Sequence, residues 1–415
     1  MTFRGLLRRV ARALRRSPVG DAADLYDSYV RNALGDYPAA DYVSIARERP
    51  PAADVKLIAY YLPQFHPIPE NDEWWGRGFT EWRNVARAFP VFSGHYQPRA
   101  PGELGYYDLR VVDVMRRQVE LAKLYGISAF CFHFYWFAGK RLLELPIENY
   151  LANADLDLPF SLCWANETWS RRWSGSEQDV LIGQRHSAAD DIAVIRYLHR
   201  YFRDGRYLKI GGRPVLTVYR PSLFPDMAAT IDRWRDEMAR LGYPGIYLIA
   251  TNAFGFCNHR EYGFDALSEF PPHQSAAPNI EHTLGVSKFR TGGRVRSYAT
   301  TVALEKLKPP VEGVVHPGVM PAWDNSARQP ASGQIYHGST PALFADWLRH
   351  AVGRAGQHPA GERLVFINAW NEWAEGAYLE PDLRFGYGYL DACAAAVRAN
   401  AESGPAVEIR ADPVL

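Results

Sequence analysis

Cysteine is scarce in this chain of 415 residues, and its spacing argues against a structural zinc fold. The 4 cysteines form none of the Cys-x-x-Cys or His-x-x-x-His spacings that are typical of zinc ligands. They stand far apart, at Cys131, Cys163, Cys257 and Cys393. We therefore expect reduced thiols in the core, no metal site and no other cofactor.

Long apolar runs are also missing from the sequence. No segment approaches the roughly 18 apolar residues of a membrane-spanning helix. The first residues lack the continuous apolar stretch of a secretory signal. Together these absences predict a cytoplasmic location.

Neither sign of charge is in excess over the whole chain. Lys and Arg number 47 against 46 Asp and Glu, which leaves a formal net charge of +1. A nucleic-acid-binding protein usually has a strong positive field. We therefore expect no nucleic-acid partner.

Positive charge is nevertheless concentrated at the start of the chain. In residues 1–16, apolar side chains recur at helical spacing and arginines fill most other positions. The pattern predicts a basic amphipathic helix over residues 1–18, able to make peripheral contact with the anionic inner face of the cytoplasmic membrane. A flexible basic tail, or a helix docked on another protein, would give the same pattern.

From residue 55 onward, short apolar runs alternate with longer amphipathic segments, which is typical of parallel strands connected by helices. Eight segments have strand character: Lys56–Tyr61, Ile127–Phe134, Phe160–Trp164, Val215–Tyr219, Ile246–Thr251, Ala266–Ser268, Gly318–Pro321 and Leu364–Ala369. Helices are predicted at Val111–Tyr125, Ala188–Phe202, Met227–Leu241 and Pro341–Val352. The pattern predicts an α/β chain with a (β/α)8 TIM barrel and enlarged loops at its C-terminal face. The barrel would occupy residues 55–402, after an extension over 19–54 and before a tail over 403–415.

A doubly wound sheet is the competing architecture. It normally has a glycine-rich turn after its first strand. Here the first predicted strand continues into Leu62-Pro63-Gln64-Phe65-His66-Pro67, which contains no glycine. The barrel is therefore favoured.

The last predicted strand leads into the most informative segment, FINAWNEWAEGAYLE. Glu372 and Glu375 lie three positions apart between tryptophans, which provides a proton donor, a proton acceptor and flat surfaces for a sugar ring. The alternative is a solvated surface loop. The apolar side chains of Trp370, Trp373 and Tyr378 argue against full solvation, and carboxylates among aromatics tend to have shifted pKa values. We predict that both glutamates are catalytic.

Aromatic and polar residues follow nearly every predicted strand. In a barrel these strand ends meet at one rim, where catalytic residues lie. Each such residue can instead be a packed or hydrogen-bonded part of the rim. Other residues near this rim are Glu81, Tyr219 and His273. The predicted substrate contacts are Tyr60, His133, Tyr135, Trp164, Asn166, Glu167, Trp323, Asp324 and Trp373.

Seven segments between about residues 55 and 382 resemble one family: IAYYLPQFHPIPEND, EWWGRGFTEW, FCFHFYWF, LCWANETW, GFDALSEFPPH, PGVMPAWDNSAR and NAWNEWAEGAYLEPD. They look like the WbsX-type proteins, glycosyltransferases of bacterial surface-polysaccharide (lipopolysaccharide O-antigen) biosynthesis. Those proteins are in turn similar to the endo-α-mannosidase and endo-α-mannanase barrels of glycoside hydrolase family 99.

The resemblance implies roles for the two glutamates. The hydrolase family has its catalytic pair in an Asn-Glu-Trp-x-Glu-Gly motif, and Asn371, Glu372, Trp373, Glu375 and Gly376 match it. By this resemblance, Glu372 is the base that removes the proton from the sugar 2-hydroxyl, and Glu375 is the acid that protonates the departing oxygen. The spacing by itself also fits a covalent retaining mechanism, with carboxyl groups about 5 to 5.5 Å apart, or an inverting one, at about 6.5 to 9.5 Å.

The predicted function is a retaining glycoside-processing enzyme that acts on a bacterial surface polysaccharide or its lipid-linked precursor. The predicted partner is an oligosaccharide or lipid-linked glycan. A nucleotide-sugar-dependent glycosyltransferase and a glycan-binding barrel without activity are the alternatives. Nucleotide-sugar transferases often hold a metal with Asp-x-Asp, but Asp155-Leu156-Asp157 precedes a strand, at the barrel end opposite the rim.

Overall fold

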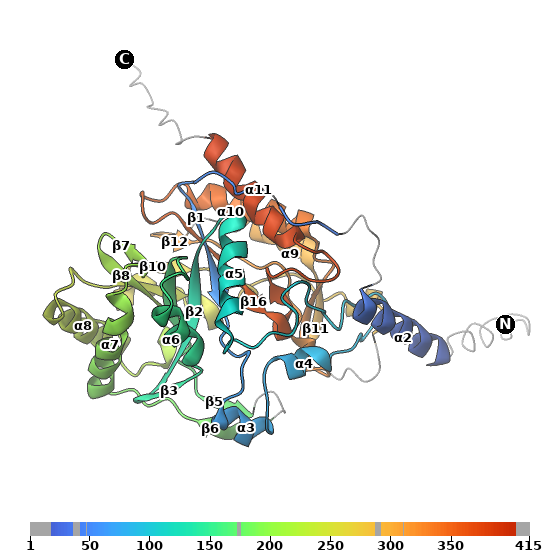
Figure 1. Cartoon of the computed structure of the whole chain (residues 1–415), viewed down its shortest axis with the longest axis horizontal. Helices are drawn as coiled ribbons and strands as arrows, with labels where there is room; N and C mark the ends of the chain where they lie inside the picture. The colour runs from blue at the N-terminus through green and yellow to red at the C-terminus, as the bar shows by residue number, and fades with distance from the viewer. Residues whose placement is uncertain are drawn as a thin grey trace, which may run out of the picture.

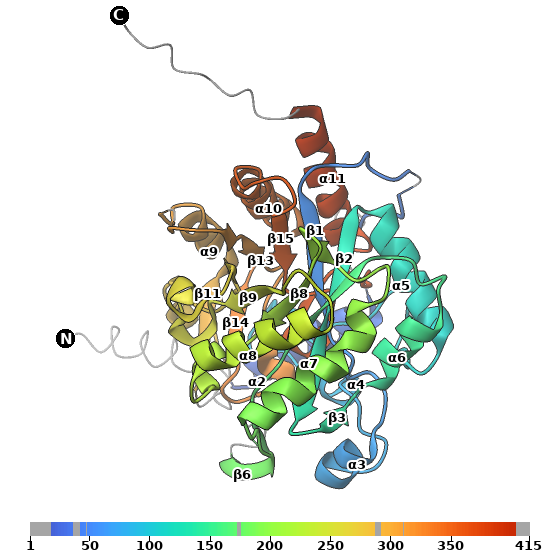
Figure 2. The same cartoon turned by 90° about the vertical axis from the view of Figure 1, so that its left-hand side faces the viewer.

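Nine short parallel strands form the centre of the protein in the computed structural model, which describes residues 18–35, 42–46, 48–171, 176–286, 292–309 and 311–403. Their order in the sheet is β12-β10-β9-β8-β4-β2-β1-β15-β13, and each neighbouring pair is parallel. The strands are β1 (Lys56–Tyr61), β2 (Ile127–Phe137), β4 (Phe160–Trp164), β8 (Arg213–Val218), β9 (Tyr247–Thr251), β10 (Ala266–Ser268), β12 (Val315–His316), β13 (Gly318–Val319) and β15 (Leu364–Ile367). The predicted TIM-barrel class is confirmed (Figures 1 and 2).

The barrel closes through one segment that is split at Pro317. Strand β12 pairs with β10 on one side, and β13 pairs with β15 on the other. The seventh strand therefore begins before the predicted Gly318. A Cβ atom at Gly318 would lie 2.1 Å from the carbonyl oxygen of Glu269, so only glycine fits this close approach of two backbones.

Helices cover the outside of the strands, as Figures 1 and 2 show. Three of these helices begin at Ala188, Met227 and Pro341. Their N-termini are capped by the side chains of Ser187, Asp226 and Thr340, which accept hydrogen bonds from backbone N–H groups. The connection from β9 to β10 contains only two 3-10 turns. The helices are α5 (Val112–Leu124), α6 (Leu145–Ala152), α7 (Ala188–Phe202), α8 (Met227–Arg240), α9 (Tyr298–Glu305), α10 (Pro341–Ala355) and α11 (Gly388–Ser403).

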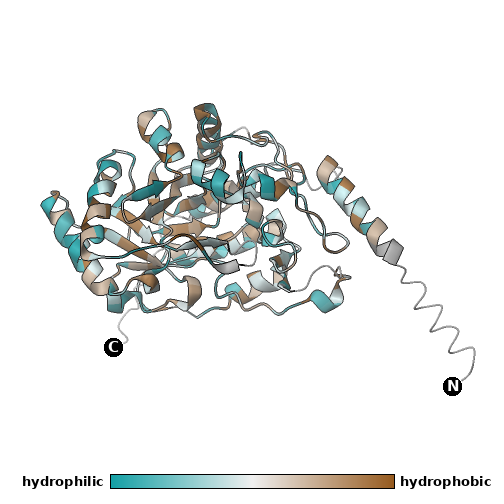
Figure 3. Ribbon diagram, turned by 90° about the horizontal axis from the view of Figure 1, so that it is seen from below, coloured by the Kyte–Doolittle hydropathy of each residue, from teal (hydrophilic) through white to brown (hydrophobic). Residues whose placement is uncertain are grey.

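Successive side chains of a strand point to opposite faces of the sheet, so the strands contribute to two apolar cores. Tyr60 belongs to a cluster made mainly of strand residues inside the barrel, whereas its neighbour Tyr61 belongs to the layer between strands and helices. In Figure 3 the central strands are largely hydrophobic and the outer helices carry many hydrophilic residues. Within the described ranges, no helix is both long and apolar enough to cross a membrane.

The enlarged loops contain short elements of their own. They are α3 (Pro69–Trp75), α4 (Trp82–Ala86), β3 (Lys140–Leu142), β5 (Trp169–Arg171), β6 (Ser176–Ile182), β7 (Lys209–Ile210), β11 (Arg294–Ser297), β14 (Gln334–His337), β16 (Asn371–Glu372) and β17 (Ala377–Tyr378).

A further helix, α2 (Pro18–Leu34), precedes the barrel and was not predicted from the sequence. Its Asn32 side-chain amide donates to the carbonyl oxygens of His95 at 2.9 Å and Gln97 at 2.7 Å. The predicted basic helix of residues 1–16 lies outside the described residues.

Candidate active site

A short hairpin after β15 holds the two predicted catalytic glutamates. Glu372 ends β16, which pairs antiparallel with β17, and Glu375 lies in the 3-10 turn between them. The Asn371 side chain accepts from the backbone N–H of Leu62 at 2.7 Å and donates to the carbonyl oxygen of Leu62 at 3.0 Å. This amide ties the hairpin to the end of β1, so both glutamates are held at the C-terminal rim.

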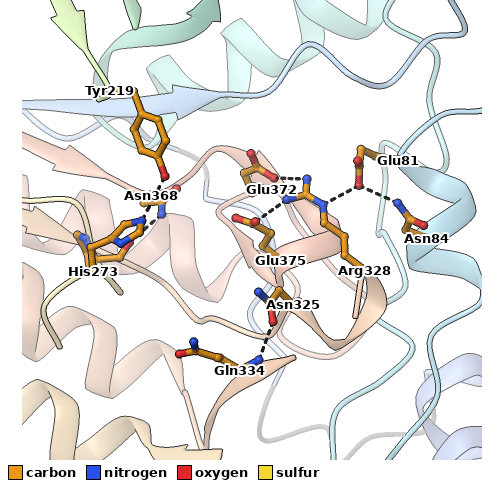
Figure 4. Close-up of polar contacts among 11 residues, drawn as sticks. Glu81, Asn84, Tyr219, His273, Asn325, Arg328, Gln334, Asn368, Glu372 and Glu375 are labelled. Carbon is orange, nitrogen blue, oxygen red and sulfur yellow. Dashed lines mark hydrogen bonds and ion pairs between the residues drawn. The ribbon is translucent and has the colours of Figure 1, made fainter. Parts of the chain in front are cut away.

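Arg328 lies between the two glutamates, as Figure 4 shows. Its Nη2 donates to Glu372 Oε2 at 2.9 Å, and its Nη1 donates to Glu375 Oε1. Its Nε donates to Glu81 Oε2 at 3.2 Å. One guanidinium is therefore shared by three carboxylates. The Arg328 side chain is only 9% exposed, so solvent screens these charges weakly.

Burial sets the protonation of this cluster. Burial raises the pKa of Glu372 to about 8, in spite of Arg328, and the charges of Glu375 and Glu81 add to the rise. Burial also raises the pKa of Glu375, which is opposed by Arg328. Because the two groups share one partner, they titrate as a pair. Their raised pKa values favour the protonated form of each glutamate, against the influence of Arg328.

Sequence reasoning missed the partners of the pair. Arg328 ends the quoted segment PGVMPAWDNSAR, but no spacing rule connects it to Glu372 and Glu375, 44 and 47 positions later. Glu81 was placed near the rim without a role, and it is fully buried at the start of α4. The signal that could have identified them was the density of charged residues at the predicted rim.

Three predicted contacts lie close to the glutamate pair. Burial raises the pKa of Tyr135, and the charge of Glu372 adds to this rise. Burial and, to a smaller extent, the charge of Arg328 together lower the pKa of His133 to about 4. Tyr60 stacks on the His133 ring, with centroids 5.7 Å apart. Tyr60, His133 and Tyr135 are thus grouped at one side of the cluster.

Asn166 and Glu167 connect the loops after β4 and β8. The Asn166 side chain accepts from the Arg220 backbone N–H and donates to the Arg220 carbonyl oxygen, both at 2.8 Å. Arg220 Nη1 donates to Glu167 Oε1 at 2.7 Å. After burial and Glu81, the charge of Glu167 also contributes to the raised pKa of Glu375. Glu167 therefore lies near the pair, whereas Asn166 is used in joining two loops.

A second polar pair lies beside the cluster (Figure 4). Tyr219 Oη and His273 Nε2 are 3.2 Å apart. Burial raises the pKa of Tyr219, as do the charges of Glu167 and Glu375. These two side chains provide further hydrogen-bonding groups at the rim.

The predicted tryptophan contacts are packed in the interior of the protein. Trp164 is fully buried, and its ring packs 6.1 Å from that of Trp234 on α8. Trp373 is 1% exposed, stacks on Tyr378 at 3.7 Å and donates to Glu380 at 2.6 Å. Trp323 belongs to the outer core. This placement gives no support to their predicted role as sugar platforms.

Asp324 supports the hairpin of Glu372 and Glu375 through its backbone and side chain. It accepts from His95 at 2.7 Å and from Gln97 at 2.8 Å, and its backbone N–H donates to the Glu375 carbonyl oxygen at 2.6 Å. Burial alone would raise the pKa of Asp324, but the charges of His95 and Arg99 outweigh it and lower the pKa. An ionised Asp324 with these partners positions Glu375, so a role in positioning fits better than the predicted substrate contact.

The described part of the chain contains no group of three or more His, Cys, Asp or Glu side chains placed to hold a metal ion. The polar groups at the rim are instead paired with one another through Arg328 and Arg220.

Comparison with known proteins gives the family. The model of the family described as Glycosyltransferase WbsX matches residues 57–393. The chain belongs to the WbsX glycosyltransferase family. This confirms the resemblance in the sequence segments, and the family name makes the chain a carbohydrate-active protein without giving the kind of reaction.

Two relatives from strains of Xanthomonas campestris pv. campestris, both described as uncharacterized protein WxcX, are 50% identical to this WbsX-family chain over 344 residues. The match covers 83% of the chain and 50% of each relative, so the chain spans about half their length.

Solved structures share the fold of this WbsX-family chain. An endo-alpha-mannosidase of glycoside hydrolase family 99 from Bacteroides thetaiotaomicron has a TM-score of 0.53 at 14% identity, covering 85% of the chain and 99% of that structure. A glycoside hydrolase-like protein has a TM-score of 0.54 at 13% identity, covering 87% and 99%.

Proposed function

We propose that this WbsX-family chain is a retaining glycoside-processing enzyme that acts on a bacterial surface polysaccharide or its lipid-linked precursor, as in O-antigen or capsule biosynthesis. The observation that carries the proposal is the buried pair Glu372 and Glu375 on one guanidinium at the barrel rim. A structural ion pair has no need of two carboxylates with raised pKa values on one arginine. An acid-base pair does, because one member must hold a proton while the other accepts one.

In the proposed first step, Glu372 accepts the proton of the sugar 2-hydroxyl. The 2-oxygen then attacks the anomeric carbon while Glu375 donates its proton to the departing glycosidic oxygen. The product is a 1,2-anhydro sugar. In the second step, Glu375 accepts the proton of water or a sugar hydroxyl that attacks the anomeric carbon, and Glu372 returns its proton to the 2-oxygen. Two inversions give net retention.

Arg328 has a distinct part in this proposal. Its positive charge opposes the burial that raises both pKa values. Without it, both glutamates would stay protonated and no base would be present. With it, the pair can hold a single proton, and the sugar hydroxyls that bind next to each carboxylate decide its position.

The neighbouring side chains form the proposed sugar site. Three groups near the pair support this. The charge of Glu372 adds to the raised pKa of Tyr135, the charge of Arg328 lowers the pKa of His133, and the charge of Glu167 adds to the raised pKa of Glu375. The Tyr219 and His273 pair adds a hydroxyl and an imidazole. We assign hydroxyl binding to these groups rather than to Trp164 or Trp373, which are buried in packing layers.

The acceptor decides between two reactions. With water the enzyme is a hydrolase, and with a sugar hydroxyl it is a transferase. A nucleotide-sugar-dependent glycosyltransferase is the second candidate, because the family description names glycosyl transfer. A glycan-binding barrel without activity is the third, and the intact glutamate pair argues against it.

Incubation of the protein with lipid-linked oligosaccharide, with and without nucleotide sugars, separates these candidates. Free oligosaccharide in the absence of nucleotide sugar supports hydrolysis. An elongated glycan formed only with nucleotide sugar supports nucleotide-dependent transfer. Binding without any product, together with unchanged affinity in Glu372→Gln, would leave only the binding barrel.

Glycosyl fluorides test the assigned roles. Fluoride leaves without protonation, so Glu375→Gln should keep its first step on a glycosyl fluoride, whereas Glu372→Gln should lose several powers of ten in rate on every substrate. The exposed Glu120→Gln on α5 is the control. The opposite behaviour of the two variants would exchange their roles.

A further inference from the structure

A separate pocket lies next to the hairpin of Glu372 and Glu375, between the segment 94–99 and the start of α10. It shares Asp324 with the support of Glu375. None of the three glutamates that surround Arg328 lines it. The proposed sugar chemistry therefore leaves this pocket without a role.

The lining of the pocket is rich in cationic and imidazole groups. The basic side chains in the lining are Arg99, Arg384, His95 and His337. Asp324 is the one acid among the described lining residues. The oxygens of Asp324 already accept hydrogen bonds from His95 and Gln97 at Oδ2 and from the Ser326 backbone N–H at Oδ1. Its charge is thus engaged by groups of the protein, and it balances only part of the positive charge.

Arg99 is the deepest cation of the pocket. It is 5% exposed, and its guanidinium lies 4.9 Å from the centre of the Tyr96 ring. Its Nε–H has no hydrogen-bond partner among the described residues. A buried N–H of a charged group without a partner is costly. Arg384 lies 5.0 Å from the same ring, so the two guanidinium groups share one aromatic side chain.

The start of α10 adds a third favourable feature for an anion. Gly338, Ser339 and the N-cap Thr340 line the pocket immediately before this helix of 15 residues. The N-terminus of a helix carries a partial positive charge. Pro341 has no N–H and the Leu343 N–H donates to the Thr340 side chain, so α10 contributes mainly through this charge. Arginine side chains and a helix N-terminus together are the groups by which proteins hold phosphate.

We propose that this pocket binds a phosphate group, held by Arg99 and Arg384 at the N-terminal end of α10. Inorganic phosphate, a nucleoside diphosphate and the diphosphate of a lipid-linked glycan all offer this chemistry. The binding site does not depend on the proposed function.

The pocket is connected to the catalytic hairpin through Arg99. A Cβ atom at Gly376 would lie 2.9 Å from the Arg99 guanidinium, so this group is in direct contact with the residue after Glu375. Asp324, on the same pocket wall, donates its backbone N–H to Glu375. A bound phosphate would therefore order the backbone on both sides of the proposed acid. This consequence, unlike the binding itself, rests on the proposed function.

Calorimetric titration with inorganic phosphate tests the site. We expect saturable binding to the wild type, and about tenfold or more weaker binding to Arg384→Gln, because one of two charge-assisted contacts is lost. Arg349→Gln is the matched control, since this arginine lies on α10 and is 54% exposed. Equal binding by all three proteins, or no saturable binding to the wild type, would overturn the proposal.

Two further measurements keep the result clear. Thermal unfolding shows whether Arg384→Gln is folded; if it is not, Arg384→Lys replaces it, with the same direction expected because the two-pronged contact of the guanidinium is lost. Glu375→Gln should bind phosphate as the wild type does, so failure of the pocket and failure of the proposed catalysis are distinguishable. Tighter binding of uridine diphosphate than of phosphate indicates a nucleotide source, and tighter binding of vesicles containing phosphatidylglycerol indicates a lipid source.

Discussion

Arg328 shows how a single side chain sets the chemistry of its neighbours. Its guanidinium contacts three carboxylates while almost completely buried. Burial favours the neutral form of each glutamate, and the arginine favours the charged form. Neither influence removes the other, so the pKa of Glu372 ends at about 8 rather than at either extreme.

The raised pKa of Glu372 predicts a pH-dependent stability. Its pKa is about 8 in the folded chain against an ordinary value of 4.5. Between these values the unfolded chain loses the proton and the folded chain keeps it, so stability falls as the pH rises. Glu372→Gln lacks this ionisation. From about pH 5 to about pH 8.5, its melting temperature should therefore rise by a few degrees relative to the wild type.

Thermal unfolding of both proteins across this pH range measures the difference, with Glu120→Gln as the exposed control that should follow the wild type at every pH. Two parallel curves for Glu372→Gln and the wild type would contradict a raised pKa at this position.

At the level of single residues, the sequence predicted the glutamates but not what controls them. Glu372 and Glu375 are neighbours in the sequence, so their spacing and aromatic surroundings were visible. Arg328 and Glu81 are 247 positions apart, and nothing local marks either as a partner. The predicted tryptophan contacts stay predictions for a related reason. Aromatic density identifies a rim, but it does not distinguish an open ring from one such as Trp373 that packs on Tyr378.

The hairpin β16–β17, which holds the two proposed catalytic glutamates, depends on one left-handed residue. Gly376 has φ of +61° and ends the 3-10 turn that contains Glu375. A Cβ atom at this position would lie 2.9 Å from the Arg99 guanidinium. The position therefore combines a conformational requirement with a steric one.

Gly376→Ala should reveal both requirements, and Gly211→Ala separates them. Gly211 has φ of +57°, but a Cβ there meets nothing within 4 Å. Both substitutions should cost about 1 to 2 kcal/mol for the left-handed backbone. Gly376→Ala should cost a further 1 to 3 kcal/mol, roughly, from the collision with Arg99, and should lower activity because Glu375 shifts. Chemical denaturation and activity assays check this, and equal costs for the two variants would show that the contact with Arg99 is unimportant.

Among whole elements, most strands of the barrel could be predicted, whereas the split seventh strand and helix α2 could not. Seven of the eight predicted strands begin within two residues of their observed start because buried parallel strands are continuous apolar runs. The seventh was placed late, since β12 and β13 have only two residues each around Pro317. Helix α2 was not predicted from the sequence, and its Tyr26 and Leu34 side chains are exposed.

At the scale of the whole molecule, a chain of contacts runs from α2 to the active site. Asn32 donates to the carbonyl oxygens of His95 and Gln97. The side chains of those two residues hold Asp324, and Asp324 holds the backbone of Glu375. In three of these hydrogen bonds the two residues are 63 to 229 positions apart in the sequence. Local sequence patterns carry no information on contacts between residues so far apart.

This connection predicts that a substitution in α2 affects the rim. Asn32 is 6% exposed and makes two buried hydrogen bonds, each worth about 0.5 to 1.5 kcal/mol. Asn32→Ala should therefore lower the free energy of local opening of the segment 92–98 by roughly 1 to 3 kcal/mol. Hydrogen exchange of the peptides that cover this segment measures the change, and a smaller increase in exchange should follow in the hairpin of Glu375. Arg31→Ala, at the neighbouring exposed position of the same helix, should leave both segments unchanged. Faster exchange in α2 alone, with segment 92–98 protected as in the wild type, would mean that the helix rests on the barrel without supporting its active site.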